Sequence, residues 1–191
     1  MAHLKLTIAY DGTGLVGWQR QASGVSVQGV LEEALALLDG APVAVAGAGR
    51  TDAGVHALGQ VASITLKRTI EPHRLVKAVN MHLPPAVRVL RAEEVGPEFH
   101  ARFRATAKRY RYRIANSAVL SPFERPYVWH VPWPPLDVAA MDGLPFEGWM
   151  VSQSHAARDE IDTLIRAILP PKTFTYRELP KRLYTLINGA K

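Results

Sequence analysis

One loop in the sequence places a carboxylate close to a cation in a way that could act on a substrate. The run from Gly47 to Gly54 contains three glycines in eight residues, which predicts a tight loop. Such a loop can hold Asp52 partly out of water, and Arg50 can keep its carboxylate ionised. An ionised, oriented carboxylate is a nucleophile or a general base. The bland alternative is an Asx-type turn beside a solvated arginine, a common use of Asp and Gly in loops.

A second stretch, from His100 to Arg113, is basic and rich in aromatic residues. It contains six Lys and Arg residues and no acidic residue, which equals the net charge of +6 of the whole chain. Cations suit phosphates, and a tyrosine can stack on a nucleobase. We therefore predict that these cations contact an RNA backbone: Arg102, Arg104, Lys108, Arg109, Arg111 and Arg113. In the alternative, Tyr110, Tyr112 and Ile114 pack in the core and the arginines form a solvated face.

Composition excludes several classes of function. The chain has no cysteine, which excludes disulfides, a cysteine nucleophile, thiolate zinc and iron–sulfur clusters. Its seven histidines show no metal-ligand spacing, so we expect no metal. No apolar run approaches the roughly 20 residues that span a bilayer, and the N-terminus lacks the layout of a signal peptide. We expect a cytoplasmic protein that does not engage a membrane.

Hydrophobic periodicity predicts the elements that position these residues. The expected strands are 4–10, 43–46, 59–66 and 86–95, with helices over 26–39 and from Pro72 to the Leu83-Pro84-Pro85 run. This order is that of an α+β, ferredoxin-like βαββαβ unit, whose two helices cover one face of an antiparallel sheet.

The remainder of the chain is less regular. Residues 101–106 and 109–114 are expected to form an extra hairpin or to extend the sheet, with Arg109, Arg111 and Arg113 on one face. Residues 117–136 are expected to form an ordered loop. Two short helices are predicted over 159–169 and 176–187.

Six sequence blocks, taken together, carry a family resemblance. They are Tyr10-Asp11-Gly12 with Gly17-Trp18-Gln19-Arg20-Gln21; Ser26-Val27-Gln28; Gly49-Arg50-Thr51-Asp52-Ala53-Gly54-Val55-His56-Ala57; Asn80 before Leu83-Pro84; Phe99-His100-Ala101-Arg102-Phe103; and Ala107-Lys108-Arg109-Tyr110-Arg111-Tyr112. In this order, over about residues 3–141, they resemble the bacterial tRNA pseudouridine synthase A family. The resemblance implies isomerisation of uridine to pseudouridine at positions 38 to 40 of the tRNA anticodon stem-loop, without a cofactor. It also implies a homodimer and a fold of two ferredoxin-like halves.

The resemblance also assigns roles to three residues. Asp52 falls on the family's catalytic aspartate, the nucleophile. Arg50 falls on the arginine that pairs with this aspartate and helps to displace the target base. Tyr110 falls on the tyrosine that stacks on the target uracil.

The chain departs from the family pattern after Met141, where the blocks of the family's second half are not recognisable. We therefore predict a pseudouridine synthase N-terminal domain over 1–141 that carries the catalytic loop. Residues 142–191 are predicted to be an unrelated or frame-shifted helical tail. The sheet edge that a second half would cover then needs the tail or another copy as its partner.

Three hypotheses for function stay open on this reading. The first is a tRNA uridine isomerase, whose activity the missing half could impair. The second is a non-catalytic RNA-binding remnant of such an enzyme. The third is a regulatory protein in which the tail helices around Thr173-Phe174-Thr175 form a winged-helix-like contact.

Overall fold

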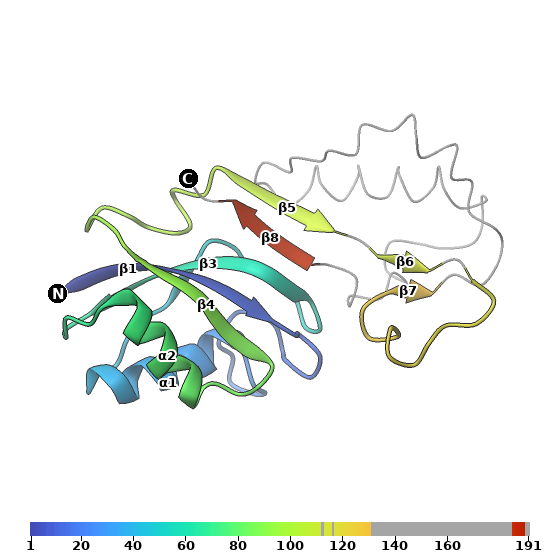
Figure 1. Ribbon diagram of the computed structural model, residues 1–191, viewed down its shortest axis with the longest axis horizontal. Helices are drawn as coiled ribbons and strands as arrows, with labels where there is room; N and C mark the ends of the chain where they lie inside the picture. The colour runs from blue at the N-terminus through green and yellow to red at the C-terminus, as the bar shows by residue number, and fades with distance from the viewer. Residues whose placement is uncertain (112, 116, 131–184, 190–191) are drawn as a thin grey trace.

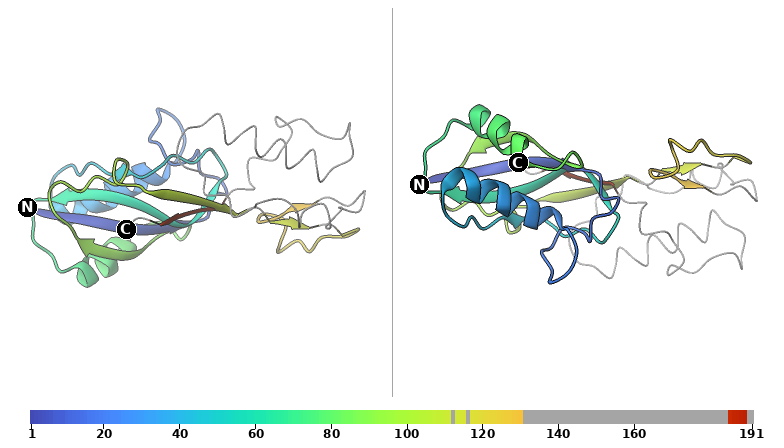
Figure 2. Two further views of the ribbon diagram at one scale, coloured as in Figure 1. Left: turned by 90° about the horizontal axis from the view of Figure 1, so that it is seen from above. Right: turned by 90° about the horizontal axis from the view of Figure 1, so that it is seen from below.

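The computed structural model describes residues 1–111, 113–115, 117–130 and 185–189, and shows a twisted sheet with two helices on one face (Figures 1 and 2). The elements in chain order are β1 (Ala2–Tyr10), α1 (Val27–Asp39), β2 (Ala46–Gly47), β3 (His56–Leu66), α2 (Pro72–His82), β4 (Val87–Glu94), β5 (Ala107–Arg111), β6 (Ile114–Ala115), β7 (Trp129–His130) and β8 (Thr185–Gly189). Among the described residues, no helix is both long and apolar enough to cross a membrane.

Helix α1 begins and ends where its sequence provides caps. The Ser26 side chain accepts a hydrogen bond from the Gly29 N–H at 3.1 Å, which satisfies one of the free donors of the first turn. At the other end Gly40 adopts a left-handed conformation with φ of 72° and donates its N–H to the Ala36 carbonyl at 2.9 Å. The predicted bounds of this helix are therefore confirmed.

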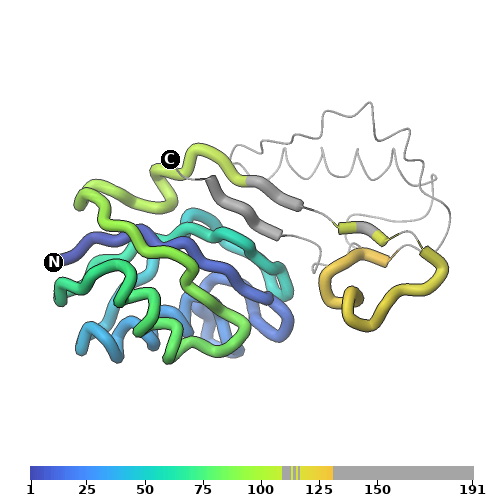
Figure 3. Tube along the Cα trace, viewed as in Figure 1, coloured from blue at the N-terminus to red at the C-terminus, as the bar shows by residue number. Residues whose placement is uncertain are grey.

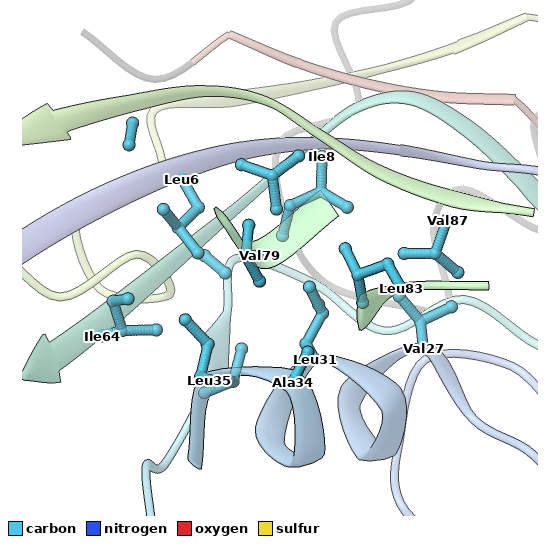
Figure 4. Packing of buried hydrophobic residues seen from close by; sticks show 14 of the residues in the cluster. Leu6, Ile8, Val27, Leu31, Ala34, Leu35, Ile64, Val79, Leu83 and Val87 are labelled. Carbon is cyan, nitrogen blue, oxygen red and sulfur yellow. The ribbon is translucent and has the colours of Figure 1, made fainter. Parts of the chain in front are cut away.

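The core lies between the helices and the sheet (Figure 4). Leu31 and Leu35 of α1 are fully buried, as are Leu6 and Ile8 of β1. Val79 of α2 belongs to the same cluster, which also takes in side chains of β3 and β4. Burial of this apolar face holds both helices to the sheet.

The strand order confirms the ferredoxin-like unit. β1 pairs antiparallel with β3 on one side and with β4 on the other, and β2 pairs antiparallel with β3. Strand β8 pairs parallel with β3, and β5 pairs antiparallel with β8, so the main path is β4-β1-β3-β8-β5. The edge of β3 is thus covered by a strand from the predicted tail.

Several predicted elements differ from the structure. Residues 101–106 are not a strand, because the Arg104 N–H bonds to the His100 carbonyl at 2.9 Å and closes a turn. No hairpin forms there, and β5 extends the sheet through β8, which was the alternative. Thr185–Ile187, predicted as helix, belong to strand β8. The rest of that predicted helix and the one over 159–169 lie outside the described residues.

The strand predicted over 43–46 is only Ala46–Gly47 in the structure, and hydrogen bonds from α1 explain the difference. Side chains of α1 bond to the backbone of Val45: Gln28 donates to its carbonyl at 3.1 Å, and Glu32 accepts from its N–H at 3.4 Å. These bonds replace a strand ladder at Val45, whose side chain is buried.

The edge strand β4 has a partner in α2. The Asn80 side chain donates to the Val89 carbonyl at 2.8 Å and accepts from the Val89 N–H at 2.9 Å. One amide thus takes the place of a neighbouring strand at the edge of the sheet.

Candidate active site

The loop between β2 and β3 packs against the segment that follows β1. The Trp18 N–H donates to the Thr51 carbonyl at 3.0 Å, and the Gly54 N–H donates to the Leu15 carbonyl at 3.2 Å. Gly17, at φ of 106°, lies so close to the loop that a Cβ atom there would collide with the Thr51 carbonyl oxygen. The two backbones can approach this closely only because Gly17 has no side chain.

Thr51 is the residue that fixes the direction of the neighbouring side chains. It is buried, and its hydroxyl hydrogen-bonds the Tyr10 hydroxyl at 2.8 Å. Arg50 and Asp52 on either side of it are exposed. The prediction that Asp52 is held partly out of water is therefore wrong, because Thr51 takes the inward position.

Arg50 and Asp52 do not form the predicted ion pair. Among the residues that the structure describes, neither side chain has an ion-pair partner. The loop therefore exposes a cation and a carboxylate that do not pair with each other. Its backbone is held in place by the buried Thr51 between them.

A buried glutamine anchors the beginning of the loop. Gln60 of β3 is fully buried and donates from Nε2 to the Gly49 carbonyl at 2.9 Å. The Ala48 N–H donates to the Val61 carbonyl at 2.8 Å. Gln60 was not singled out from the sequence, although a glutamine among small and apolar neighbours in a predicted strand was a signal that could have found it.

The segment that lines the loop is itself held to α1. Arg20 forms ion pairs with Glu32 at 3.0 Å and with Glu33 at 3.1 Å. Gln19 donates to the Gln28 side chain at 2.7 Å. These contacts connect the segment after β1, which packs against the Asp52 loop, to helix α1.

Asp11, at the end of β1, is the centre of a polar cluster at the other end of the loop. Its carboxylate accepts from the Thr13 N–H at 2.9 Å and from the Tyr127 hydroxyl at 3.0 Å, and lies 3.0 Å from His56 Nδ1. Burial acts to raise the pKa of Asp11, but the hydrogen bonds from Thr13 and Tyr127 and the proximity of His56 outweigh it and lower the pKa. The bond to Asp11 raises the pKa of Tyr127. Asp11 lies in one of the six family blocks, but its sequence context alone assigns it no role.

Lys108 lies over the loop, whereas the other predicted cations are arranged differently. Its Nζ is 3.2 Å from the place that a Cβ atom on Gly49 would occupy. Burial, followed by the like charge of Arg102, lowers the pKa of Lys108. Arg102 and Arg104 are exposed on the neighbouring turn. This places three of the six predicted cations close to the start of the Asp52 loop or on the turn before β5.

Arg113 does not continue the row of arginines on β5, because that strand ends at Arg111. Its guanidinium instead lies 3.6 Å from the Glu124 carboxylate, and its carbonyl accepts from the Trp129 N–H at 2.7 Å. The prediction that Arg109, Arg111 and Arg113 share one strand face is therefore wrong for Arg113. The side chains of Arg109 and Arg111 and the whole of Tyr112 lie outside what the structure describes.

Tyr110 is placed by its backbone register. In β5 it pairs with Leu186 of β8, and Leu186 pairs with Ala57 of β3. Tyr110 is therefore two strands, roughly 10 Å, from Ala57, which follows the Asp52 loop by a few residues. The side chain of Tyr110 lies outside the described residues.

The arrangement offers an exposed carboxylate on an anchored loop, flanked by cations. Within the described part of the chain, no three His, Asp or Glu side chains are grouped as metal ligands would be. The chemistry available from these groups is nucleophilic or general-base attack by Asp52 on a substrate that brings negative charge.

Comparison with known proteins places this loop in a family. A family model described as tRNA pseudouridine synthase matches residues 6–104. The tRNA pseudouridine synthase A of Solibacter usitatus is 45% identical, over 100% of this chain and 80% of its own length. The enzymes of the same name from Methylacidiphilum infernorum and Solidesulfovibrio magneticus are each 52% identical, over 67% and 74% of this chain. The chain spans 50% and 53% of these two relatives.

Proposed function

This chain belongs to the tRNA pseudouridine synthase family, and we propose that it converts uridine to pseudouridine in the anticodon stem-loop of tRNA, at positions 38 to 40. The observation that carries the proposal is Asp52, exposed on a loop that buried Thr51 and Gln60 hold in place. The matched residues 6–104 include this whole loop.

Asp52 is proposed as the nucleophile. Its carboxylate oxygen forms a bond to the nucleotide, at C1′ of the ribose or C6 of the uracil, and the bond between N1 and C1′ breaks. The base then rotates and C5 forms a bond to C1′. A bond between Asp52 and C1′ breaks as this bond forms, whereas a bond between Asp52 and C6 breaks after it. C5 loses its proton and N1 gains one, so the product is an isomer of the substrate. This sequence consumes no oxidant, reductant or co-substrate.

Arg50 and Tyr110 are proposed to prepare the base for this attack. A uracil within the stem-loop has to leave its stack before Asp52 can reach it, which costs a few kcal/mol. Arg50, exposed beside Asp52, helps to displace the base and pairs with the Asp52 carboxylate when RNA is bound. Tyr110, whose strand is next but one to β3, stacks on the extruded uracil.

The basic residues are proposed to bind the RNA backbone. Arg102, Arg104 and Lys108 form no ion pair with any acidic residue that the structure describes, so their charges are free to meet phosphates. The burial that lowers the pKa of Lys108 is offset when a phosphate lies beside it. Arg109 and Arg111 are proposed as further backbone contacts. Arg113 is proposed as a weaker contact, because it has to leave Glu124 first.

The assembly and location of the protein are part of the same proposal. We propose that two copies form a homodimer that acts on tRNA in the cytoplasm. Pairing of β8 with both β3 and β5 supports the view that the late part of the chain completes the sheet rather than lying apart from it. Light scattering coupled to gel filtration tests the dimer: a mass near that of one chain contradicts it.

Substitution of Asp52 tests the activity. Asp52→Asn removes the nucleophilic charge without altering the size of the side chain, so turnover should fall at least about 1,000-fold, while tRNA affinity stays within about twofold. The measurement is mass-spectrometric mapping of pseudouridine in unmodified tRNA treated with purified protein, together with filter binding of the same tRNA. Glu94→Gln, an exposed carboxylate at the end of β4, is the matched control. Unchanged turnover in Asp52→Asn would eliminate the assignment.

A second candidate function is RNA binding without turnover. The observation that favours it is that Arg50 and Asp52 form no ion pair with each other in the described part of the chain. The same assay separates the two functions, because a binding protein retains salt-dependent affinity for tRNA but forms no pseudouridine.

A further inference from the structure

Asp11 joins three segments of the chain that are distant in sequence. Its own turn follows β1, His56 begins β3, and Tyr127 lies in the segment 117–130. Figure 3 shows that this last segment stands beside the main sheet rather than within it. None of these three residues has a role in the proposed reaction.

The orientation of the His56 ring depends on Asp11. Nδ1 lies 3.0 Å from the Asp11 carboxylate and 3.2 Å from the Gly12 backbone nitrogen. One nitrogen cannot accept from Gly12 and donate to Asp11 at the same time, and the carboxylate is the stronger partner for a ring N–H. Nε2 is buried and has no hydrogen-bond partner among the described residues. The ring is therefore held mainly through Nδ1.

His56 in turn fixes the exit of the Asp52 loop. It is the first residue of β3, and the preceding Val55 carbonyl is in such close contact with Gly12 that no Cβ atom could fit between them. The Val55 N–H donates to the Asp52 carbonyl at 3.2 Å. A displacement of His56 should therefore also move the backbone of Asp52, because the turn between Asp52 and Val55 connects them.

Tyr127 connects the outlying segment to this point. Its hydroxyl donates to Asp11 at 3.0 Å, and its ring lies 5.3 Å from the His56 ring, tilted by 56°. Both contacts converge on the same pair of side chains.

We propose that Asp11 is a positioning residue that, through His56 and Tyr127, couples the segment 117–130 to the loop that carries Asp52. The expected effect on turnover rests on the proposed isomerase function. The expected effect on the structure of the Asp52 loop does not.

A double-mutant cycle tests the coupling. Asp11→Ala removes both contacts and should lower kcat for pseudouridine formation about 10- to 100-fold, because a misplacement of about 1 Å at a reacting group has effects of this size. Tyr127→Phe removes one hydroxyl and should lower kcat about 3- to 10-fold. The KM for tRNA should stay within about twofold in both variants. Because Tyr127 acts through Asp11, the double variant should be no slower than Asp11→Ala alone.

Hydrogen exchange supplies a readout that needs no activity. Asp11→Ala should raise amide exchange in residues 50–56 and 117–130 together, while α1 and α2 stay protected. The matched control is Asp39→Ala, which removes a carboxylate that accepts two backbone N–H groups at the far end of α1. This control should not alter exchange in either segment.

The outcomes separate this proposal from the proposed function. Three results would each overturn the positioning role. The first is a kcat of the double variant that is lowered by the product of the two single effects, and the second is a higher KM with unchanged kcat. The third is amide exchange in Asp11→Ala that matches the exchange in Asp39→Ala. A parent chain that forms no pseudouridine overturns the proposed function, and the exchange result then decides the positioning role alone. If Asp11→Ala does not fold, Tyr127→Phe, which alters an exposed side chain, decides by the same two measurements.

Discussion

The core between the helices and the sheet differs from the loop layer, by which we mean the Asp52 loop (residues 47–55) and the segment after β1 (residues 11–20) that packs against it. The two regions bury different kinds of atoms. Between α1 and the sheet, the fully buried side chains are aliphatic and include Leu31, Leu35 and Ile8. Around the loop, the anchors are hydrogen bonds from Tyr10 and Gln60 and the polar cluster of Asp11. Apolar burial is non-directional, whereas hydrogen bonds fix angles. Stability and the placement of Asp52 should therefore respond to different substitutions.

The largest effect on stability is expected from a cavity in the core. Leu35→Ala should lower the free energy of unfolding by about 2–5 kcal/mol, because Leu35 is fully buried in the α1 interface. Turnover per folded molecule should be unchanged. Urea unfolding measures the loss, and Leu37→Ala on the same helix, with Leu37 70% exposed, is the control that should cost little. Equal losses in the two variants would contradict the packing described here.

Two glycines near the Asp52 loop should respond differently to the same substitution. Gly14 and Gly17 both have positive φ, but only Gly17 lies against the Thr51 carbonyl. Ala at either position should cost about 1–2 kcal/mol of stability because of the left-handed backbone. Gly17→Ala should in addition move Thr51 and lower turnover about 10-fold or more. Assays of kcat and of thermal unfolding in both variants check this; a similar fall in kcat for Gly14→Ala would contradict it.

The sequence predicted the core better than the loop layer, for a physical reason. The stripe of apolar residues in α1 and the Ser26 cap are local signals, and the helix begins and ends where they place it. An irregular loop has no period, so the inward position of Thr51 and the outward position of Asp52 could not be read from spacing. The bond between Asp11 and Tyr127 joins residues 116 apart in sequence, and no local pattern encodes it.

Strand β8 shows the same limit in the fold. The apolar residues of 176–187 were spaced as in a helix, yet Thr185–Gly189 is a strand because it fills the gap between β3 and β5. Tertiary pairing overrides local preference at such positions. The place of Tyr110 next to that strand was therefore not predictable from its own segment.

Asn80 tests whether a hydrogen bond in the core region behaves like one in the loop layer. Asn80→Ala should lower the free energy of unfolding by about 1–3 kcal/mol, since it leaves the Val89 N–H and carbonyl without the side-chain partner. Turnover per folded molecule should not change. Asn80→Asp keeps the acceptor for the Val89 N–H and should lose less. Equilibrium unfolding of the three proteins gives the order, and a loss of turnover at constant stability would contradict it.

The smallest effect is expected from Asp39, which accepts hydrogen bonds from the Arg68 and Lys67 N–H groups. These bonds lower its pKa below 3.8, mainly through the Arg68 N–H. The lowered pKa means that Asp39 contributes stability above the unfolded pKa, and that this contribution is lost as pH falls through the folded pKa. The difference in unfolding free energy between the parent and Asp39→Asn should be largest near neutral pH and should shrink as the pH falls below about 4. A difference independent of pH would show that the carboxylate charge is not involved.

Strand β8 also dictates the order in which the molecule can be completed. The β1–β4 unit with α1 and α2 contains the early part of the chain, and it has its own core. In the part of the chain that the structure describes, β5 joins the sheet through β8, so Tyr110 takes its place in the sheet after residues 185–189 have been synthesised. Closing so long a stretch of chain is slow compared with forming local contacts. A nascent chain would therefore form the Asp52 loop well before Tyr110, the proposed stacking residue, takes its place in the sheet.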